Sequence, residues 1–108
     1  MDKKIIDTIK SVLEPTEGIV HDYDASSDGQ SGRILLSDKK LLFVREKGFL
    51  KKTYDLITDL AYNQIDTITR TGSTLTLSKG EESHSFTSGF ASRIEEDLKK
   101  LKQSKIKA

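Results

Sequence analysis

The sequence of 108 residues contains no cysteine and no long apolar run. The lack of cysteine excludes a disulfide scaffold, thiolate metal sites and a thiol nucleophile. No apolar stretch approaches the roughly 20 residues that a membrane-spanning helix needs. The first residues lack the apolar segment and the small-residue cleavage site of a secretory signal. These absences predict a single-domain protein that is cytoplasmic.

The chain also lacks an excess of one charge, since 18 Lys and Arg face 17 Asp and Glu. The net charge of +1 excludes a strongly basic nucleic-acid binder and a highly charged disordered tail. The charges are unevenly spread, because residues 31–58 hold seven Lys or Arg against three acidic residues, and 91–108 hold six against three. Two interpretations stay open, an ordinary solvated surface and local basic patches on a middle hairpin and a last helix.

Residues 3–13 predict an amphipathic helix, because aliphatic side chains recur there at spacings of three and four. The apolar stripe consists of Ile5, Ile6, Ile9, Val12 and Leu13. Pro15 disfavours helix at the residue before it. A helix this short is unstable alone, so its stripe must pack on its own domain or on a second copy. We expect this helix over 1–14, one domain over 15–104 and a frayed tail over 105–108.

From Gly18 to Thr87 the pattern changes to short apolar runs between turn residues, which predicts up to seven short antiparallel strands. The expected strands cover 19–23, 33–37, 40–46, 50–54, 65–71, 74–78 and 83–87. Two of them, with the runs 34–36 and 41–44, are apolar on both faces and therefore predict the most covered part of the sheet. A long polar loop is expected over 25–32, where glycines allow unusual backbone angles.

A final helix is expected to begin at Ser88 or at Ser92. Ser92 with Glu95 three residues later fits a capping box. The apolar stripe of this helix consists of Phe90, Ile94, Leu98 and Leu101.

Strands followed by one helix is the layout of a pleckstrin-homology-like domain, and particular segments strengthen the comparison. The run Gly32–Val44 resembles the second and third strands of bacterial pleckstrin-homology domains. Gly48–Lys52 resembles the next turn, Gln64–Asp66 a strand entry, and Thr74–Leu77 the sixth strand. The resemblance covers residues 15–102. It implies a mainly β, pleckstrin-homology-like antiparallel barrel or sandwich of about seven strands, capped by a C-terminal helix and preceded here by an extra amphipathic helix.

Eukaryotic members of this fold often bind phosphoinositides through a basic loop between their first two strands. The corresponding segment here, Asp22–Gly32, contains Asp22, Asp24 and Asp28 and no Lys or Arg. Like charge would repel a phosphate, so we expect no phosphoinositide site of that type. The resemblance to bacterial members, several of which self-associate, implies an interaction module with a protein partner or a homo-oligomer.

Residues that could carry chemistry are few. His21 and His84 are the only imidazoles, and Asp22 and Asp24 beside His21 are too small a cluster for a metal. No serine lies in a glycine-flanked strand-to-helix turn, and no glycine-rich phosphate loop is present. We therefore expect no catalysis, no cofactor and no metal site, and we expect no nucleic-acid binding because aromatic residues near the basic hairpin are scarce.

Our first hypothesis is a non-catalytic protein-interaction or self-assembly module. The stripe of the N-terminal helix would mediate assembly, and an exposed sheet edge would offer a second contact by strand addition.

The alternative is weak peripheral binding to an anionic membrane by a basic hairpin with an apolar tip. This hairpin comprises Arg45, Lys47, Phe49, Lys51 and Lys52. The same lysines would also suit an edge strand that must not pair with other chains. A small apolar ligand between the barrel and the last helix is a third option.

Overall fold

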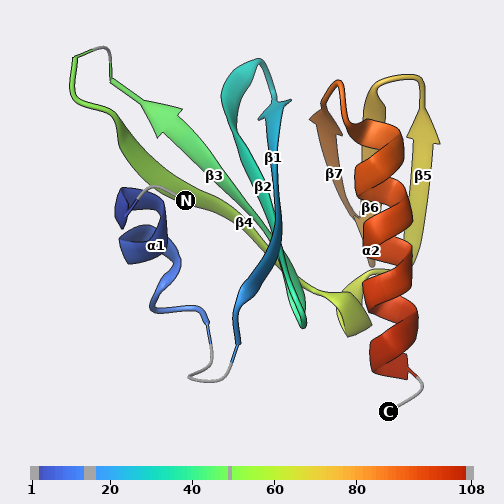
Figure 1. Cartoon of the computed structure of the whole chain (residues 1–108). Helices are drawn as coiled ribbons and strands as arrows, with labels where there is room; N and C mark the ends of the chain where they lie inside the picture. Colours follow the sequence, from blue (N-terminus) through green and yellow to red (C-terminus); the bar gives the residue numbers. More distant parts are fainter. Residues whose placement is uncertain (1–2, 14–16, 49, 107–108) are drawn as a thin grey trace.

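The computed structural model describes residues 3–13, 17–48 and 50–106, which form one seven-stranded antiparallel sheet and two helices (Figure 1). The elements in chain order are α1 (Lys3–Ile9), β1 (Ile19–Ser27), β2 (Gln30–Ser37), β3 (Lys40–Lys47), β4 (Thr53–Ala61), the short 3-10 helix η1 (Tyr62–Gln64), β5 (Thr67–Thr71), β6 (Thr74–Lys79), β7 (Glu82–Thr87) and α2 (Ala91–Ile106). The predicted class, a mainly β chain of seven strands with an N-terminal and a C-terminal helix, is confirmed. No helix in the described ranges combines the length and the apolar character needed to cross a bilayer.

The strand order is β4-β3-β2-β1-β7-β6-β5, so β4 and β5 form the two ends of an open sheet. The β1–β4 half and the β5–β7 half are joined at the β1–β7 boundary, where one register pair links Ser26 to Thr87. Figure 1 shows the two halves splayed apart, with α2 along the β5–β7 half. The sheet is thus folded over rather than closed into a complete ring of strands.

The main core lies between the two halves and α2. It contains Ile34 and Leu36 of β2, and Leu41 and Phe43 of β3. From the other half and α2 it gathers Leu75, Leu77, Phe86, Ile94 and Leu98. Phe43 and Phe86 meet across the halves with ring centroids 5.4 Å apart. Large apolar side chains from both halves therefore bury one another, and this burial holds the open sheet folded.

A second core covers the opposite face of the β1–β4 half. In β2, Leu35 lies between Ile34 and Leu36 of the main core and belongs to this second core. In β3, Leu42 and Val44 alternate in the same way with Leu41 and Phe43 of the main core. Ile5 and Ile9 of α1 cover these side chains, and both are almost completely buried. Successive strand residues point to opposite faces, and each face of β2 and β3 is covered by one of the two cores. The prediction that both strands are covered on both faces is therefore confirmed.

A buried polar network supports the turn between β2 and β3. Glu17 is buried and accepts a hydrogen bond from the Ser37 hydroxyl, and the Lys40 ammonium lies 4.0 Å from the Glu17 carboxylate. The Tyr62 hydroxyl donates to the Ser37 carbonyl oxygen. Burial raises the pKa of Tyr62, and the nearby carboxylates of Asp38 and Glu17 add to this rise.

Two strand predictions are wrong in detail. Residues 25–32 form no long loop, because β1 continues to Ser27 and β2 begins at Gln30. Asp28 and Gly29 alone make the turn, with φ of 52° and 76°. Two consecutive positive φ values are typical of the two-residue turn that Asp-Gly favours in hairpins. The strand expected at 50–54 begins only at Thr53 but continues to Ala61.

The expected helix ends also need correction. α1 ends at Ile9 rather than near residue 13. A tighter turn follows it, in which the Val12 N–H bonds to the Ile9 carbonyl oxygen at 3.0 Å. Neither serine is the N-cap residue of α2, because the helix begins at Ala91 and Ser92 lies inside it, while the Ser88 hydroxyl accepts from the Phe90 N–H at 3.0 Å in the turn before the helix. α2 runs to Ile106, so residues 105 and 106 of the expected frayed tail are helical, while 107 and 108 lie outside the described residues.

Candidate functional site

The two ends of the open sheet differ in how their outer edges are treated. An edge strand offers unpaired N–H and C=O groups to other chains, and proteins commonly cover, bend or charge such edges. One end of this sheet, β4, is covered and bent, whereas the other end, β5, is regular and has no covering segment along its edge among the described residues.

The β4 edge carries several protective features. The Lys4 ammonium of α1 donates to the Lys52 carbonyl oxygen at 3.0 Å, and the Thr8 hydroxyl donates to the Tyr54 carbonyl oxygen at 3.3 Å. Further along, Val44 pairs with Leu56 and Phe43 with Thr58, so Ile57 is an extra residue in a bulge. Asp55 and Asp59 add charge to the strand. α1 and the bulge together block regular pairing along β4.

Arg70 is the one charged residue of β5 and is paired with Glu95 of α2, and among the described residues this strand has no bulge and no side-chain hydrogen bond from a helix to its backbone. Its five residues pair with β6 without a register shift, from Thr67 opposite Ser78 to Thr71 opposite Thr74. In the described part of the chain, the backbone of β5 makes its hydrogen bonds within the β5–β6 hairpin. The strand contains no lysine, proline or glycine.

The hairpin turn determines which groups of β5 face outward. Thr71 and Thr74 flank a two-residue turn, so this pair exchanges both of its hydrogen bonds, and the pattern alternates along the strand. The N–H and C=O groups of Thr69 and Thr71 therefore face β6. The N–H and C=O groups of Ile68 and Arg70 face away from the sheet, which leaves four outward polar groups in a regular row.

The side chains of β5 divide between two faces. Ile68 packs against the main core, and the Arg70 guanidinium bonds to the Glu95 carboxylate of α2 at 3.2 Å. Partial burial disfavours the charged form of Glu95, but hydrogen bonds from Arg70 and Lys99 outweigh it and lower the pKa of Glu95. Thr69 is exposed on the opposite face. α2 thus holds β5 in place from one side and leaves its edge open.

The predicted interaction stripe of the N-terminal helix lies mostly inside the same chain. Ile5 and Ile9 are buried in the second core, and Val12 and Leu13 pack against it half-buried. Ile6 is the exception, with 45% of its surface exposed. Of the two packing arrangements that the sequence left open, the structure shows the one in which the stripe covers its own β2–β4 face.

The predicted basic hairpin is largely paired with acidic side chains. Arg45 and Lys47 both contact the Asp55 carboxylate at 2.8 Å, and Lys52 contacts Glu46 at 3.0 Å. Hydrogen bonds from Lys47 and then Arg45 lower the pKa of Asp55.

The tip of this hairpin is its most open part. Lys51 is exposed, and Leu50 is 92% exposed. Phe49 lies outside the described residues. The apolar side chain that the structure places at the tip is therefore Leu50.

A cluster between β1 and α2 was not predicted from the sequence. The Tyr23 hydroxyl donates to the Asp97 carboxylate, which lies 3.6 Å from His21 Nδ1. Burial and the Asp97 hydrogen bond raise the pKa of Tyr23. The Phe90 ring lies 5.8 Å from the Tyr23 ring and is half exposed. Only the packing of α2 on the sheet brings these residues together, so no local sequence signal marks them.

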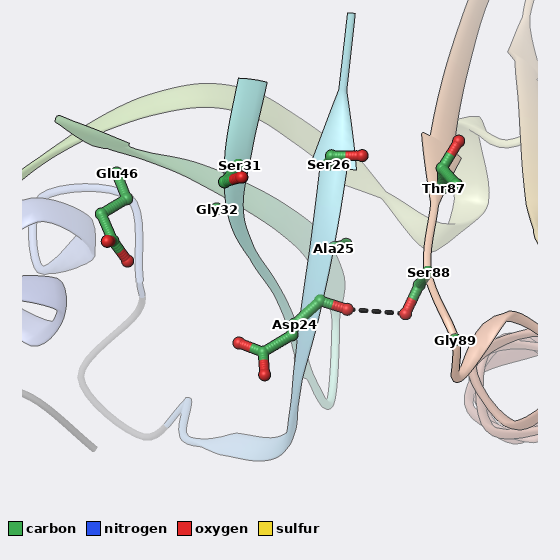
Figure 2. Close-up of a pocket in the computed structure, with 9 residues that line it drawn as sticks. All are labelled: Asp24, Ala25, Ser26, Ser31, Gly32, Glu46, Thr87, Ser88 and Gly89. Carbon is green, nitrogen blue, oxygen red and sulfur yellow. Dashed lines mark hydrogen bonds between the residues drawn. The ribbon is translucent and has the colours of Figure 1, made fainter. Parts of the chain in front are cut away.

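A hollow of about 340 Å³ opens where the β1–β2 and β7 ends diverge (Figure 2). Three of its polar side chains, those of Asp24, Glu46 and Ser88, make internal contacts. Ser88 donates to the Asp24 carbonyl oxygen at 2.6 Å, the Asp24 carboxylate bonds Arg33 at 2.6 Å, and Glu46 bonds Lys52. The Ser88–Asp24 hydrogen bond beside the hollow therefore ties the segment between β7 and α2 to β1.

The described residues contain no group of three or more His, Asp or Glu side chains placed to hold a metal ion. His84 lies 3.7 Å from Glu82 on the β6–β7 hairpin, and His21 belongs to the β1–α2 cluster.

Comparisons with known proteins concern the fold alone. No family model and no curated protein matches the sequence. A crystal structure of the C-terminal domain of an unknown protein from Leishmania infantum resembles this chain with a TM-score of 0.70. The match covers 92% of this chain and 94% of that chain at 10% identity.

Proposed function

We propose that this chain is a non-catalytic protein-interaction module of the pleckstrin-homology-like class, which acts in the cytoplasm and binds an extended segment of a partner along β5. The observation that carries this proposal is the contrast between the two sheet edges. β4 is covered by α1 and bent by a bulge, whereas β5 is regular and uncovered within the described residues. Seven strands followed by one helix support the assignment to this class, and the cysteine-free sequence is consistent with the location.

The mechanism is strand addition, in which backbone hydrogen bonds supply the affinity. The outward N–H and C=O groups of Ile68 and Arg70 make up to four such bonds, each contributing about 0.5–1.5 kcal/mol net. Partner side chains would lie over Thr69 on one face and beside α2 on the other. The N-terminal helix is a weaker candidate for the contact, because its large aliphatic residues already cover its own sheet.

Two substitutions at Arg70 test this proposal. Arg70→Pro removes an outward N–H that makes no bond to β6, while Arg70→Ala removes the side chain and keeps the N–H. Peptides selected from a phage-displayed random library on the wild-type protein should bind Arg70→Ala normally and Arg70→Pro about tenfold more weakly. Equal binding to both variants, or a failure to select any peptide, would contradict strand addition at β5.

A second candidate function is peripheral contact with an anionic membrane through the tip of the β3–β4 hairpin. The supporting observation is Leu50, which is 92% exposed next to the exposed Lys51. Insertion of Leu50 beside lysines at the lipid headgroups would combine apolar burial with electrostatic attraction. Most of the other basic residues of this hairpin are neutralised by Asp55 and Glu46, which limits the expected affinity.

Vesicle flotation tests the membrane candidate. With phosphatidylserine–phosphatidylcholine vesicles at low salt, Lys51→Gln should weaken partitioning about fivefold, since each basic residue contributes about 1 kcal/mol. Lys79→Gln, which removes the same charge from the β6–β7 hairpin, is the matched control and should bind as the wild type does. Absence of binding by the wild type at low salt would refute this candidate.

A further inference from the structure

We propose that the first occupant of the β5 edge is a second copy of this chain, bound through antiparallel β5–β5 pairing about a two-fold axis at Thr69. This inference rests on the proposed function of β5 and names the partner. The pairing would join two seven-stranded sheets into one continuous sheet across the dimer, with the same surface contributed by each copy.

The backbone pattern selects this register. With Thr69 opposite Thr69 of the other copy, Ile68 lies opposite Arg70 in both directions. Because the N–H and C=O groups of Ile68 and Arg70 all face outward, each of these two pairs exchanges two hydrogen bonds, which satisfies all four outward groups. A shift that sets Arg70 opposite Arg70 would bring like charges together and satisfy fewer groups.

The side chains are self-complementary in the same register. On the exposed face, Thr69 meets its own copy and Thr67 meets Thr71, and such threonine pairs are favourable across strands. On the other face, the aliphatic part of Arg70 lies beside Ile68, while its charge is already balanced by Glu95. The net charge of +1 imposes little long-range repulsion between two copies.

Single cysteines test this geometry on a cysteine-free background. Thr69 forms a non-hydrogen-bonded pair with its copy, where Cα atoms are about 4.5 Å apart, within the range that a disulfide spans. In a glutathione redox buffer, Thr69→Cys should therefore form a disulfide-linked dimer as protein concentration rises. Thr67→Cys alone should not, because residue 67 lies about 13 Å from its own copy.

A mixed sample supplies the decisive control. Thr67→Cys mixed with Thr71→Cys should yield mainly the heterodimer, whereas either protein alone should yield little dimer. Equal cross-linking of all three variants would indicate random collision and overturn the proposal. No cross-linking of Thr69→Cys and of the mixture would also overturn it. If the protein does not cross-link but still binds peptides that depend on the Arg70 N–H, only self-pairing is refuted. If the protein neither cross-links nor binds such peptides, strand addition at β5 is refuted as well.

Discussion

At the scale of single residues, Gly32 shows how closely the first half of the sheet is packed. A Cβ at this position would lie 2.1 Å from the Val44 carbonyl oxygen and 2.9 Å from the Phe43 ring. We predict that Gly32→Ala lowers the free energy of unfolding by about 1–3 kcal/mol, because β3 must move away. Gly89→Ala, where nothing lies within 4 Å of the added atom, is the control. Urea denaturation of both variants measures the difference, and equal stability of the two would contradict this packing.

Tyr62 gives a pH dependence whose sign follows from its raised pKa. The folded protein keeps the Tyr62 proton at pH values at which an unfolded tyrosine, with a pKa near 10, loses it. The stability due to neutral Tyr62 is therefore fully present below about pH 10, and it falls by about 1.4 kcal/mol per pH unit above.

The variant Tyr62→Phe isolates this effect. It should cost about 1–3 kcal/mol at pH 7, because the buried Ser37 carbonyl oxygen loses its donor. Its alkaline loss of stability should be shallower than that of the wild type, with a remainder from Tyr23, whose pKa is also raised. Urea denaturation between pH 8 and pH 12 provides the comparison. Identical alkaline slopes for the two proteins would show that Tyr62 does not hold its proton.

At the scale of elements, α1 is a helix of seven residues that depends on its contact with the sheet. We predict that Ile9→Ala destabilises the protein by about 2–5 kcal/mol, as expected for a fully buried side chain. Ile6→Ala should stay within about 0.5 kcal/mol of the wild type, because Ile6 is half exposed. Thermal and urea denaturation will rank these variants. A larger effect at Ile6, combined with a change in oligomer size, would instead support assembly through α1.

The elements also show what sequence reasoning can reach. The apolar runs of β2 and β3 revealed their two-sided burial, because a strand without a polar face is stable only when both of its faces are covered. Ser92 with Glu95 predicted a cap for α2, yet Ser92 lies inside the helix, and the Ser88 hydroxyl instead holds the preceding turn and donates to the Asp24 carbonyl oxygen of β1. Local cap signals do not reveal a serine whose role depends on a tertiary contact.

The same limit applies to the candidate sites. The basic hairpin was visible as a charge run, but its neutralisation by Asp55 depends on the β3–β4 register. The difference between the β4 and β5 edges depends on where α1 lies, which no periodicity reveals. The β1–α2 cluster around Asp97 joins residues far apart in the chain.

At the scale of the whole molecule, the fold consists of an open sheet with one covered edge and one uncovered edge. In the proposed arrangements one added strand pairs with β5, and the net charge of +1 imposes little long-range repulsion on a second copy. Both proposals for β5, capture of an extended segment and self-pairing, make use of the same four outward backbone groups.

Amide hydrogen exchange, resolved by NMR at each residue, tests the open β5 edge most directly. In dilute protein, the amides of Ile68 and Arg70 should exchange rapidly, while those of Thr69 and Thr71, which bond to β6, should be protected. At high concentration, or with a selected peptide, the Ile68 and Arg70 amides should become protected as well. Protection of these two amides already in the dilute monomer, or rapid exchange under all conditions, would contradict an edge that binds protein.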